Sequence, residues 1–113
     1  MRECKTVHPM RAQHCAAVRR SYDRQASTVR SLYESWAELG RKVDRLNDQF
    51  LRETNPAIKE RLSDEIEATR GDIRYVRDVL EKAYEDLEPF RTDYRISGCE
   101  EDDGPLDRVP PKP

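Results

Sequence analysis

The sequence has little apolar material, few glycines and no long apolar run. Hydrophobic residues make up 35% of the 113 residues and charged residues 39%, whereas ordinary soluble domains are about 45–50% apolar and about 25% charged. Only four glycines and one tryptophan occur. This composition argues against a compact β-barrel or an α/β enzyme, and the length allows one small domain at most. The apolar surface must therefore be concentrated in stripes.

Membrane-spanning and secretory patterns are also missing. No apolar run approaches the roughly 20 residues of a transmembrane helix, and the first residues contain no apolar stretch of the signal-peptide kind. The three cysteines, Cys4, Cys15 and Cys99, are an odd number and widely spaced. We therefore expect free thiols in a reducing compartment, and an intracellular location in the cytoplasm or the nucleus.

The chain lacks the strong basic excess of a general nucleic-acid binder, because its net charge is −2. The charge is distributed unevenly. Residues 1–52 carry 11 Lys or Arg against 6 Asp or Glu, and residues 53–113 carry 10 against 17. The two halves therefore have opposite net charge, and nucleic acid is an unlikely partner.

Proline and glycine mark the ends of two long helices. Pro9 suits the first position of a helix, where its missing N–H costs nothing. Asn55 and Pro56 form the strong interruption in the middle, since the residue before proline is pushed out of helical geometry and Asn is a good N-cap. Gly98 lies just past the end of the second stretch and suits a helix C-terminus. The pattern predicts a helical hairpin over residues 9–98 with a turn near 54–56.

The two ends of the chain are predicted to lie outside this hairpin. Residues 1–8 form a short polar lead-in. Residues 99–113 combine an acidic run with four prolines, and such a composition cannot bury enough apolar surface to fold. We expect a disordered C-terminal tail. Arg108 and the prolines after it have the composition of proline-rich ligands, an interpretation that we rank below a plain disordered tail.

Apolar residues in both stretches alternate by three and four, the pattern of helices that pack along seams. The first stripe is Cys15, Val18, Tyr22, Gln25, Val29, Leu32, Trp36, Leu39, Val43, Leu46 and Phe50, and the second is Leu62, Ile66, Thr69, Ile73, Val76, Leu80, Ala83, Leu87, Phe90 and Tyr94. Folding the chain at Pro56 sets Leu46 opposite Ile66 and places Lys42 near Glu65. The sequence therefore predicts an all-α fold, a long antiparallel helical hairpin of the coiled-coil type.

Two helices enclose little volume, and four residues widen the stripes beyond a two-helix seam: Tyr33, Trp36, Val79 and Tyr84. A wide apolar stripe requires more helices around it, so we expect self-association into a four-helix bundle or a protein partner. In a parallel homodimer, the second helices would bring together the pairs Glu65 with Arg70, Asp72 with Arg77, Val79 with Tyr84, and Asp86 with Arg91. Three of these pairs join an acid to a base, which favours a homodimer.

No arrangement of residues points to catalysis, a metal or a cofactor. The residues with metal-ligand chemistry are Cys4, His8, His14 and Cys15, but Pro9 splits them and their spacing is not that of a standard zinc site. No glycine-rich phosphate loop occurs, and two long helices offer no obvious cleft for a nucleophile and its base. We predict that the chain is not an enzyme.

The function predicted from these features is a non-catalytic interaction module: an assembly, adaptor or regulatory subunit that binds protein through a helical face. Aromatic residues on a rigid helix are effective binding anchors. One alternative is a nucleic-acid-associated protein that uses the basic first helix, with Arg11, Arg19, Arg20, Arg24 and Arg30. A third interpretation is a small viral or phage-type inhibitor that docks on a host protein.

Overall fold

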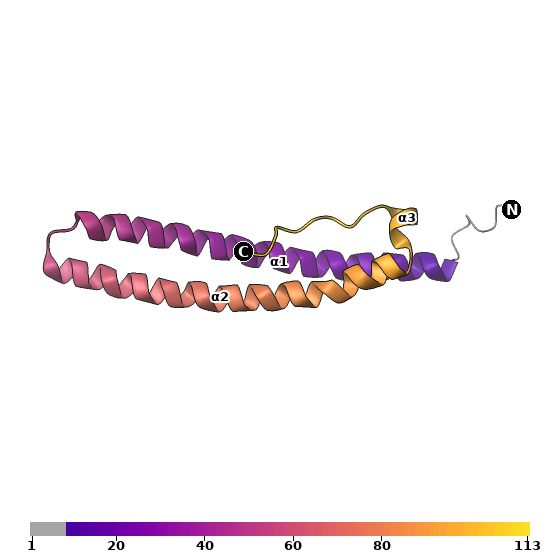
Figure 1. Ribbon diagram of the computed structural model, residues 1–113, viewed down its shortest axis with the longest axis horizontal. Helices are drawn as coiled ribbons and strands as arrows, with labels where there is room; N and C mark the ends of the chain where they lie inside the picture. The colour runs from indigo at the N-terminus through magenta and orange to yellow at the C-terminus, as the bar shows by residue number, and fades with distance from the viewer. Residues whose placement is uncertain (1–8) are drawn as a thin grey trace. The chain divides into compact units, whose positions relative to one another are not determined.

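The computed structural model describes residues 9–113. It contains two long helices and one short one: α1 spans Pro9–Arg52, α2 spans Pro56–Ile96 and α3 spans Cys99–Asp103. No strand occurs within the described residues. Helices α1 and α2 run antiparallel and pack as a hairpin (Figure 1). The predicted all-α hairpin is confirmed, and its association into a four-helix bundle stays a prediction.

The chain divides into two compact units. The turn unit, residues 31–81, consists of parts of α1 and α2 and the turn that joins them. The terminal unit, residues 9–30 and 82–113, contains the start of α1, the end of α2, α3 and a C-terminal segment, residues 104–113.

Side-chain oxygens close the turn between α1 and α2. The Asn55 Oδ1 accepts hydrogen bonds from the backbone N–H groups of Ala57 at 2.9 Å and Ile58 at 3.4 Å. The Glu53 Oε1 accepts one from the backbone N–H of Thr54 at 3.1 Å. A helix start leaves its first N–H groups without backbone partners, and an Asn side chain at the N-cap supplies one. Asn55 is therefore the N-cap of α2, as predicted from its position directly before Pro56.

Helix α2 continues through Pro89, an exposed residue in its last third. Proline has no N–H to donate, and its ring crowds the carbonyl group four residues earlier, so helices usually bend there. In Figure 1 the last turns of α2 run at an angle to the turns before them. The helix therefore accommodates the proline without ending at it.

Burial follows the two predicted stripes. The buried residues are Cys15, Val18, Tyr22, Ala26, Val29, Val43, Leu46, Ile66, Thr69, Leu80, Ala83, Tyr84, Leu87, Tyr94 and Cys99. All of them except Ala26, Tyr84 and Cys99 belong to the stripes, which confirms the seam pattern of the hairpin. The three exceptions lie in the terminal unit. Cys99 is in a disulfide, and the C-terminal segment covers Ala26 and Tyr84.

The polar members of the stripes have hydrogen-bond partners. The hydroxyl of Thr69, which is buried, donates to the carbonyl of Glu65 one turn earlier at 2.8 Å. The side-chain amide of Gln25 donates to the carbonyl of Ala83 at 3.0 Å and so links α1 to α2. A buried polar group without a partner costs about 1–3 kcal/mol, so these bonds let both residues remain in the seam.

Cys15 and Cys99 form a disulfide, so the prediction of free thiols is wrong for these two residues. The antiparallel hairpin brings the start of α1 beside the end of α2, and α3 begins with Cys99. Their Cα atoms are 5.5 Å apart, within the usual range for a bridge. Because structural disulfides persist mainly in oxidising compartments, the expectation of an intracellular location loses its cysteine argument. Cys4 lies outside the described residues.

The C-terminal residues do not have the form expected of a disordered tail. Residues 99–103 form α3, and the segment that follows lies against the helices of the terminal unit (Figure 1). Leu106 and Val109 pack against the buried side chains of that unit. The segment is held largely through its backbone carbonyl groups, which every residue type provides. Composition alone therefore gave no sign of this packing.

Candidate protein-interaction surfaces

The turn unit contains an apolar surface that its two helices leave partly open. Tyr33 and Trp36 lie one turn apart on α1, with ring centroids 5.6 Å apart and ring planes tilted by 52°. Both are partly buried, as is Leu39 on the next turn. Tilted aromatic pairs of this kind attract each other beyond their burial, so the two rings form a stable, partly exposed aromatic face.

Helix α2 contributes apolar residues with the same intermediate burial. We call the combined surface the aromatic stripe; it consists of Tyr33, Trp36, Leu39, Ile73, Val76 and Val79. The predicted register sets Trp36 opposite Val76 and Leu39 opposite Ile73. Nearer the turn, by contrast, Val43 is buried. The stripe is therefore one part of the turn unit where a two-helix seam leaves apolar residues incompletely covered, and Leu32, Phe50 and Leu62 are partly buried as well.

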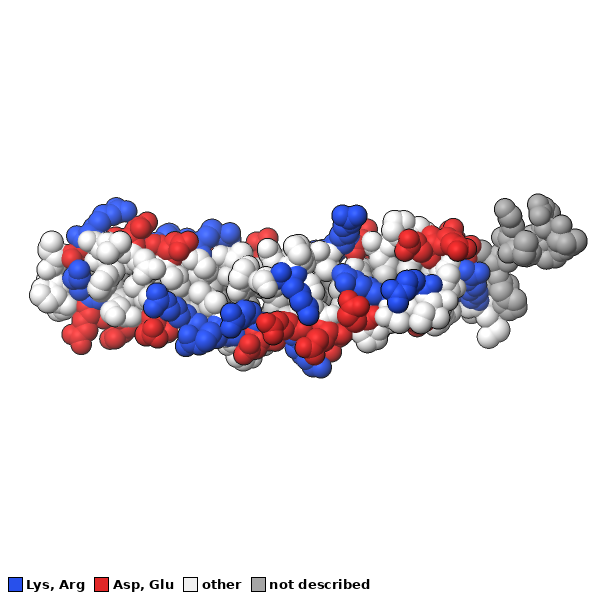
Figure 2. Space-filling view, in the orientation of Figure 1, with Lys and Arg blue, Asp and Glu red and all other residues white. Residues whose placement is uncertain are grey.

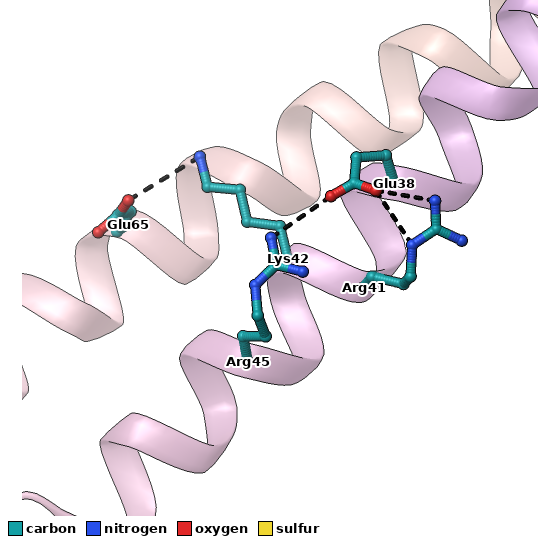
Figure 3. Close-up of polar contacts among 5 residues, drawn as sticks. All are labelled: Glu38, Arg41, Lys42, Arg45 and Glu65. Carbon is teal, nitrogen blue, oxygen red and sulfur yellow. Dashed lines mark hydrogen bonds and ion pairs between the residues drawn. The ribbon is translucent and has the colours of Figure 1, made fainter.

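Charged side chains of the turn unit contact one another along α1 and between α1 and α2 (Figure 3). The Arg41 guanidinium donates two hydrogen bonds to Glu38 Oε2, at 3.0 Å and 2.8 Å, and Arg45 donates one to the other carboxylate oxygen at 3.4 Å. The hydrogen bond from Arg41 is the main cause that lowers the pKa of Glu38. Lys42 lies 3.9 Å from Glu65 on α2, the neighbour predicted for it.

The six charged residues predicted to pair between two copies of α2 do not pair with one another within one chain. Four of them have another partner in the same chain: Glu65 with Lys42, Arg70 with Glu67, Asp86 with Lys82, and Arg91 with Glu88. Asp72 and Arg77 are exposed on the same helix. Solvent-exposed ion pairs contribute little, about 0.2–1 kcal/mol each, so these side chains can exchange partners at low cost.

Tyr84 differs from the other predicted surface residues because it is only 5% exposed. Its hydroxyl donates a hydrogen bond to the backbone carbonyl of Pro110 in the C-terminal segment. The predicted contact between Val79 of one copy and Tyr84 of another therefore requires the C-terminal segment to move away. Tyr84 belongs to a second surface, in the terminal unit.

That second surface is where sequence reasoning missed most. Tyr22 on α1 and Tyr94 on α2 donate hydrogen bonds to the carbonyl groups of Asp107 and Gly104, the latter at 2.8 Å. Leu106 packs against two buried clusters, one of which contains Tyr22 and the other Tyr94. The spacing of Leu106 and Val109 by three residues is the signal in the sequence that could have indicated a bound extended segment.

Arginines from α1 also contact the C-terminal region. Arg11 donates to the carbonyl groups of Ser97 at 3.1 Å and Gly98 at 2.7 Å, and forms an ion pair with Asp102 at 2.9 Å. Carbonyl groups at the end of a helix have no partner within it. Arg11 supplies donors there, and so ties the start of α1 to the end of α2.

Arg19 combines a carbonyl contact with an aromatic one. One of its terminal nitrogens lies 2.7 Å from the hydroxyl of Tyr94 and 2.9 Å from the carbonyl oxygen of Asp103. The guanidinium carbon lies 5.4 Å from the centre of the Tyr94 ring, within cation–π distance. The hydrogen bond with Tyr94 is the main cause that raises the pKa of Arg19.

The basic cluster considered for nucleic acid is largely committed to these contacts. Arg11, Arg19 and Arg30 donate to backbone carbonyl groups in or next to the C-terminal region, and Arg20 and Arg24 are exposed. On the face shown in Figure 2, basic and acidic side chains are interspersed. On that face a phosphate backbone would therefore meet acidic groups among the basic ones. The nucleic-acid alternative stays an untested prediction.

The residues considered for a metal site have other partners where they are described. The His14 Nε2 lies 2.9 Å from Asp93 Oδ1, and Cys15 is in the disulfide. The Ser97 hydroxyl donates to the same Asp93 oxygen at 3.1 Å. The contact with His14 is the main cause that lowers the pKa of Asp93. Within residues 9–113, no group of three or more potential ligands is placed to hold a metal ion; Cys4 and His8 lie outside that range.

Comparison with protein families, with characterised proteins and with solved structures finds no match to this chain. Among the described helices, none is both long enough and apolar enough to span a membrane. The features of the chain that bear on function are two surfaces: the aromatic stripe of the turn unit and the surface beneath the C-terminal segment.

Proposed function

We propose that the chain is a non-catalytic protein–protein interaction module whose binding surface is the aromatic stripe of the turn unit. The observation that supports this is a difference in burial. In the terminal unit, the C-terminal segment covers residues of the helix–helix seam such as Tyr22 and Leu87, which are 1% and 0% exposed. The turn unit consists of two helices and their turn alone, and its aromatic stripe remains only partly buried.

A second copy of the chain is the partner that we propose. Burying apolar surface contributes roughly 25 cal/mol per Å², and a Trp, a Tyr and four aliphatic side chains give the stripe a substantial area to bury. In a parallel arrangement of α2, Glu65 and Asp72 of one copy would meet Arg70 and Arg77 of another, and the pair of Asp86 with Arg91 would form once the C-terminal segment has moved away from Tyr84. Apolar burial would then supply the affinity, and the charges would set the orientation.

The experiment compares the sedimentation of the parent chain with that of two variants. Trp36→Ala removes the largest side chain of the stripe, whereas Tyr75→Ala removes an aromatic side chain that is 71% exposed and lies outside the stripe. We expect Trp36→Ala to raise the dimer dissociation constant at least tenfold and Tyr75→Ala to leave it unchanged. Circular dichroism of both variants verifies that the helices persist. A dimer equally strong in both variants would contradict the proposal.

A second set of variants tests the parallel orientation of α2. Changing Arg70, Arg77 and Arg91 together to Glu sets acid against acid, and three surface pairs should weaken the dimer by about 1–3 kcal/mol. A chain with Glu65, Asp72 and Asp86 changed to Lys should restore pairing with it as a heterodimer. If the variant with the three arginines replaced sediments as the parent does, the parallel contact is wrong.

A further inference from the structure

The C-terminal segment is recognised at every third residue. The carbonyl groups of Gly104, Asp107 and Pro110 each accept a hydrogen bond from the hydroxyl of a different tyrosine. The donors are, in the same order, Tyr94 on α2, Tyr22 on α1 and Tyr84 on α2. Side chains from both helices of the terminal unit therefore bind one side of the segment at a regular interval.

The apolar contacts of the segment have the same interval. Leu106 and Val109, three residues apart, both pack on the cluster formed by Tyr22, Ala26 and Leu87. The residues between them, Asp107 and Arg108, are exposed. A polyproline II helix has three residues per turn, so side chains three apart point the same way and the backbone carbonyl groups remain open to outside donors.

Two arginines on α1 also contact the backbone of the segment rather than its side chains. Arg30 donates to the carbonyl of Arg108 at 3.0 Å. Arg19 lies within hydrogen-bond distance of the carbonyl groups of Gly104, at 3.2 Å, and Pro105, at 3.3 Å. The polar contacts therefore recognise an extended backbone, and the side-chain preference is confined to the two apolar positions.

We propose that this surface is a binding site for extended, proline-rich segments that carry two apolar residues three apart. We call it the tyrosine surface; it is formed by Tyr22, Tyr84, Tyr94, Ala26, Leu87 and Arg19. Aromatic side chains with hydrogen-bond donors are the usual means by which proteins recognise the polyproline II conformation. The C-terminal segment, with Pro105, Pro110 and Pro111, is the occupant in the structure and shows the chemistry that the surface accepts.

The occupant that we propose in trans is a proline-rich segment of another protein. The segment starts five residues after Cys99, which the disulfide fixes to α1. Such tethering gives an effective concentration on the order of millimolar. The same segment from a second copy has no affinity advantage and loses to the tethered one. A foreign segment with proline at the two exposed positions between its apolar residues is more preorganised and can compete.

The experiment uses the full chain with its own segment weakened. Leu106→Asp together with Val109→Asp removes both apolar contacts and leaves the tyrosines and the disulfide intact. The probe is a fluorescent peptide with the sequence of residues 104–113, titrated by fluorescence anisotropy. We expect this peptide to bind the double variant at least tenfold more tightly than it binds the parent, whose surface is already occupied.

Two matched controls test the three-residue interval and the tyrosine donors. A peptide with one Ala inserted between Arg108 and Val109 places the apolar residues four apart and should bind at least tenfold more weakly. Adding Tyr22→Phe and Tyr84→Phe to the double variant removes two hydroxyl donors. The original peptide should then bind at least tenfold more weakly than it binds the double variant. Equal binding of the two peptides, or no binding to a double variant whose helices persist, would overturn the proposal.

If the double variant loses its helical circular dichroism, the same titration is carried out with Leu106→Ser and Val109→Ser, and the same outcomes support or overturn the proposal.

A third peptide, with proline in place of Asp107 and Arg108, tests the foreign occupant. It should displace the tethered segment of the parent at concentrations where the original peptide does not. Equal displacement by the two peptides would contradict a foreign occupant and leave the tethered segment as the only ligand. This proposal goes beyond the proposed self-association, since peptide binding is measured without reference to the oligomeric state.

Discussion

A Cβ atom on Gly98 would lie 2.5 Å from the terminal nitrogen of Arg11. Gly98 follows α2 with a φ of 70°, the left-handed conformation that glycine adopts without a steric penalty. The same guanidinium donates to the carbonyl of Gly98 at 2.7 Å. Gly98 thus provides both the backbone turn after α2 and the space in which the Arg11 guanidinium binds that turn.

Replacing Gly98 by Ala should therefore lower the free energy of unfolding for two reasons. A left-handed alanine costs roughly 1–2 kcal/mol, and displacing the Arg11 side chain removes hydrogen bonds that contribute about 1 kcal/mol each. Urea unfolding monitored by circular dichroism measures the sum.

Two other glycines provide comparisons. Gly104 has a φ of 81° and a ψ of 177°, a conformation essentially confined to glycine, and a Cβ atom on it would meet no neighbouring group within 4 Å, so Gly104→Ala should show a backbone cost larger than that of a left-handed alanine. Gly40 lies inside α1 with equally open surroundings, and Gly40→Ala should stabilise the helix by up to about 1 kcal/mol. Equal losses for Gly98→Ala in the parent and in a chain that also carries Arg11→Ala would show that the Arg11 contact contributes nothing.

Reduction of the disulfide should destabilise the chain strongly. The bridge joins residues 84 apart in sequence, and the chain-entropy relation assigns a loop of that length about 4–5 kcal/mol. Urea unfolding with and without a dithiol reductant measures this difference. The variant with Cys15→Ala and Cys99→Ala should unfold like the reduced parent and should not respond to the reductant, whereas Cys4→Ser should respond as the parent does.

Acid should weaken the contact between Asp93 and His14. Because the pKa of Asp93 is lowered in the folded chain, its stabilising contribution is present above the ordinary Asp pKa of about 3.9 and is lost as the pH falls through the lower folded value. We expect Asp93→Asn to be less stable than the parent at pH 5, and the difference to shrink steadily below about pH 4. Asp44→Asn, at an exposed site in the turn unit, is the control. A difference that stays constant down to pH 2 would exclude this explanation.

Shortening the chain after Asp103 should lower the melting temperature. The deletion removes the acceptors of three tyrosine hydroxyls, which contribute about 0.5–1.5 kcal/mol each, and uncovers the cluster beneath Leu106 and Val109. For a chain of this size, each 1 kcal/mol corresponds to roughly 4–8 °C. Deleting only Lys112 and Pro113, which are exposed, should change little. A shift of less than 2 °C after the longer deletion would show that the segment contributes no stability.

The seam of the hairpin could be predicted because its determinants are local and repeated. Residues such as Val43, Leu46 and Ile66 recur at intervals of three and four, so each helical turn supports the same interpretation. Asn55 caps α2 through hydrogen bonds from Ala57 and Ile58, two and three residues further on. Both features depend on short-range spacing, which a sequence displays directly.

The disulfide and the C-terminal contacts could not be predicted in this way. In the predicted register Cys15 faces residue 97, two residues before Cys99, and the turn at Gly98 brings Cys99 back to it. The C-terminal segment is bound through carbonyl groups, which carry no residue identity. The four residues predicted to widen the stripes were placed correctly in part: Tyr33, Trp36 and Val79 are incompletely covered, whereas Tyr84 is buried under a segment assumed to be disordered.

The bridge between Cys15 and Cys99 also determines how the chain would respond to mechanical tension. A pull applied to residues before Cys15 and after Cys99 passes directly across the sulfur–sulfur bond. The two cysteines are 84 apart in sequence, and the chain between them, which includes the turn and nearly all of α1 and α2, forms a closed loop outside that path. Such a loop bears no load while the bridge is intact, so the hairpin would stay folded under tension that unravels an unbridged helix pair.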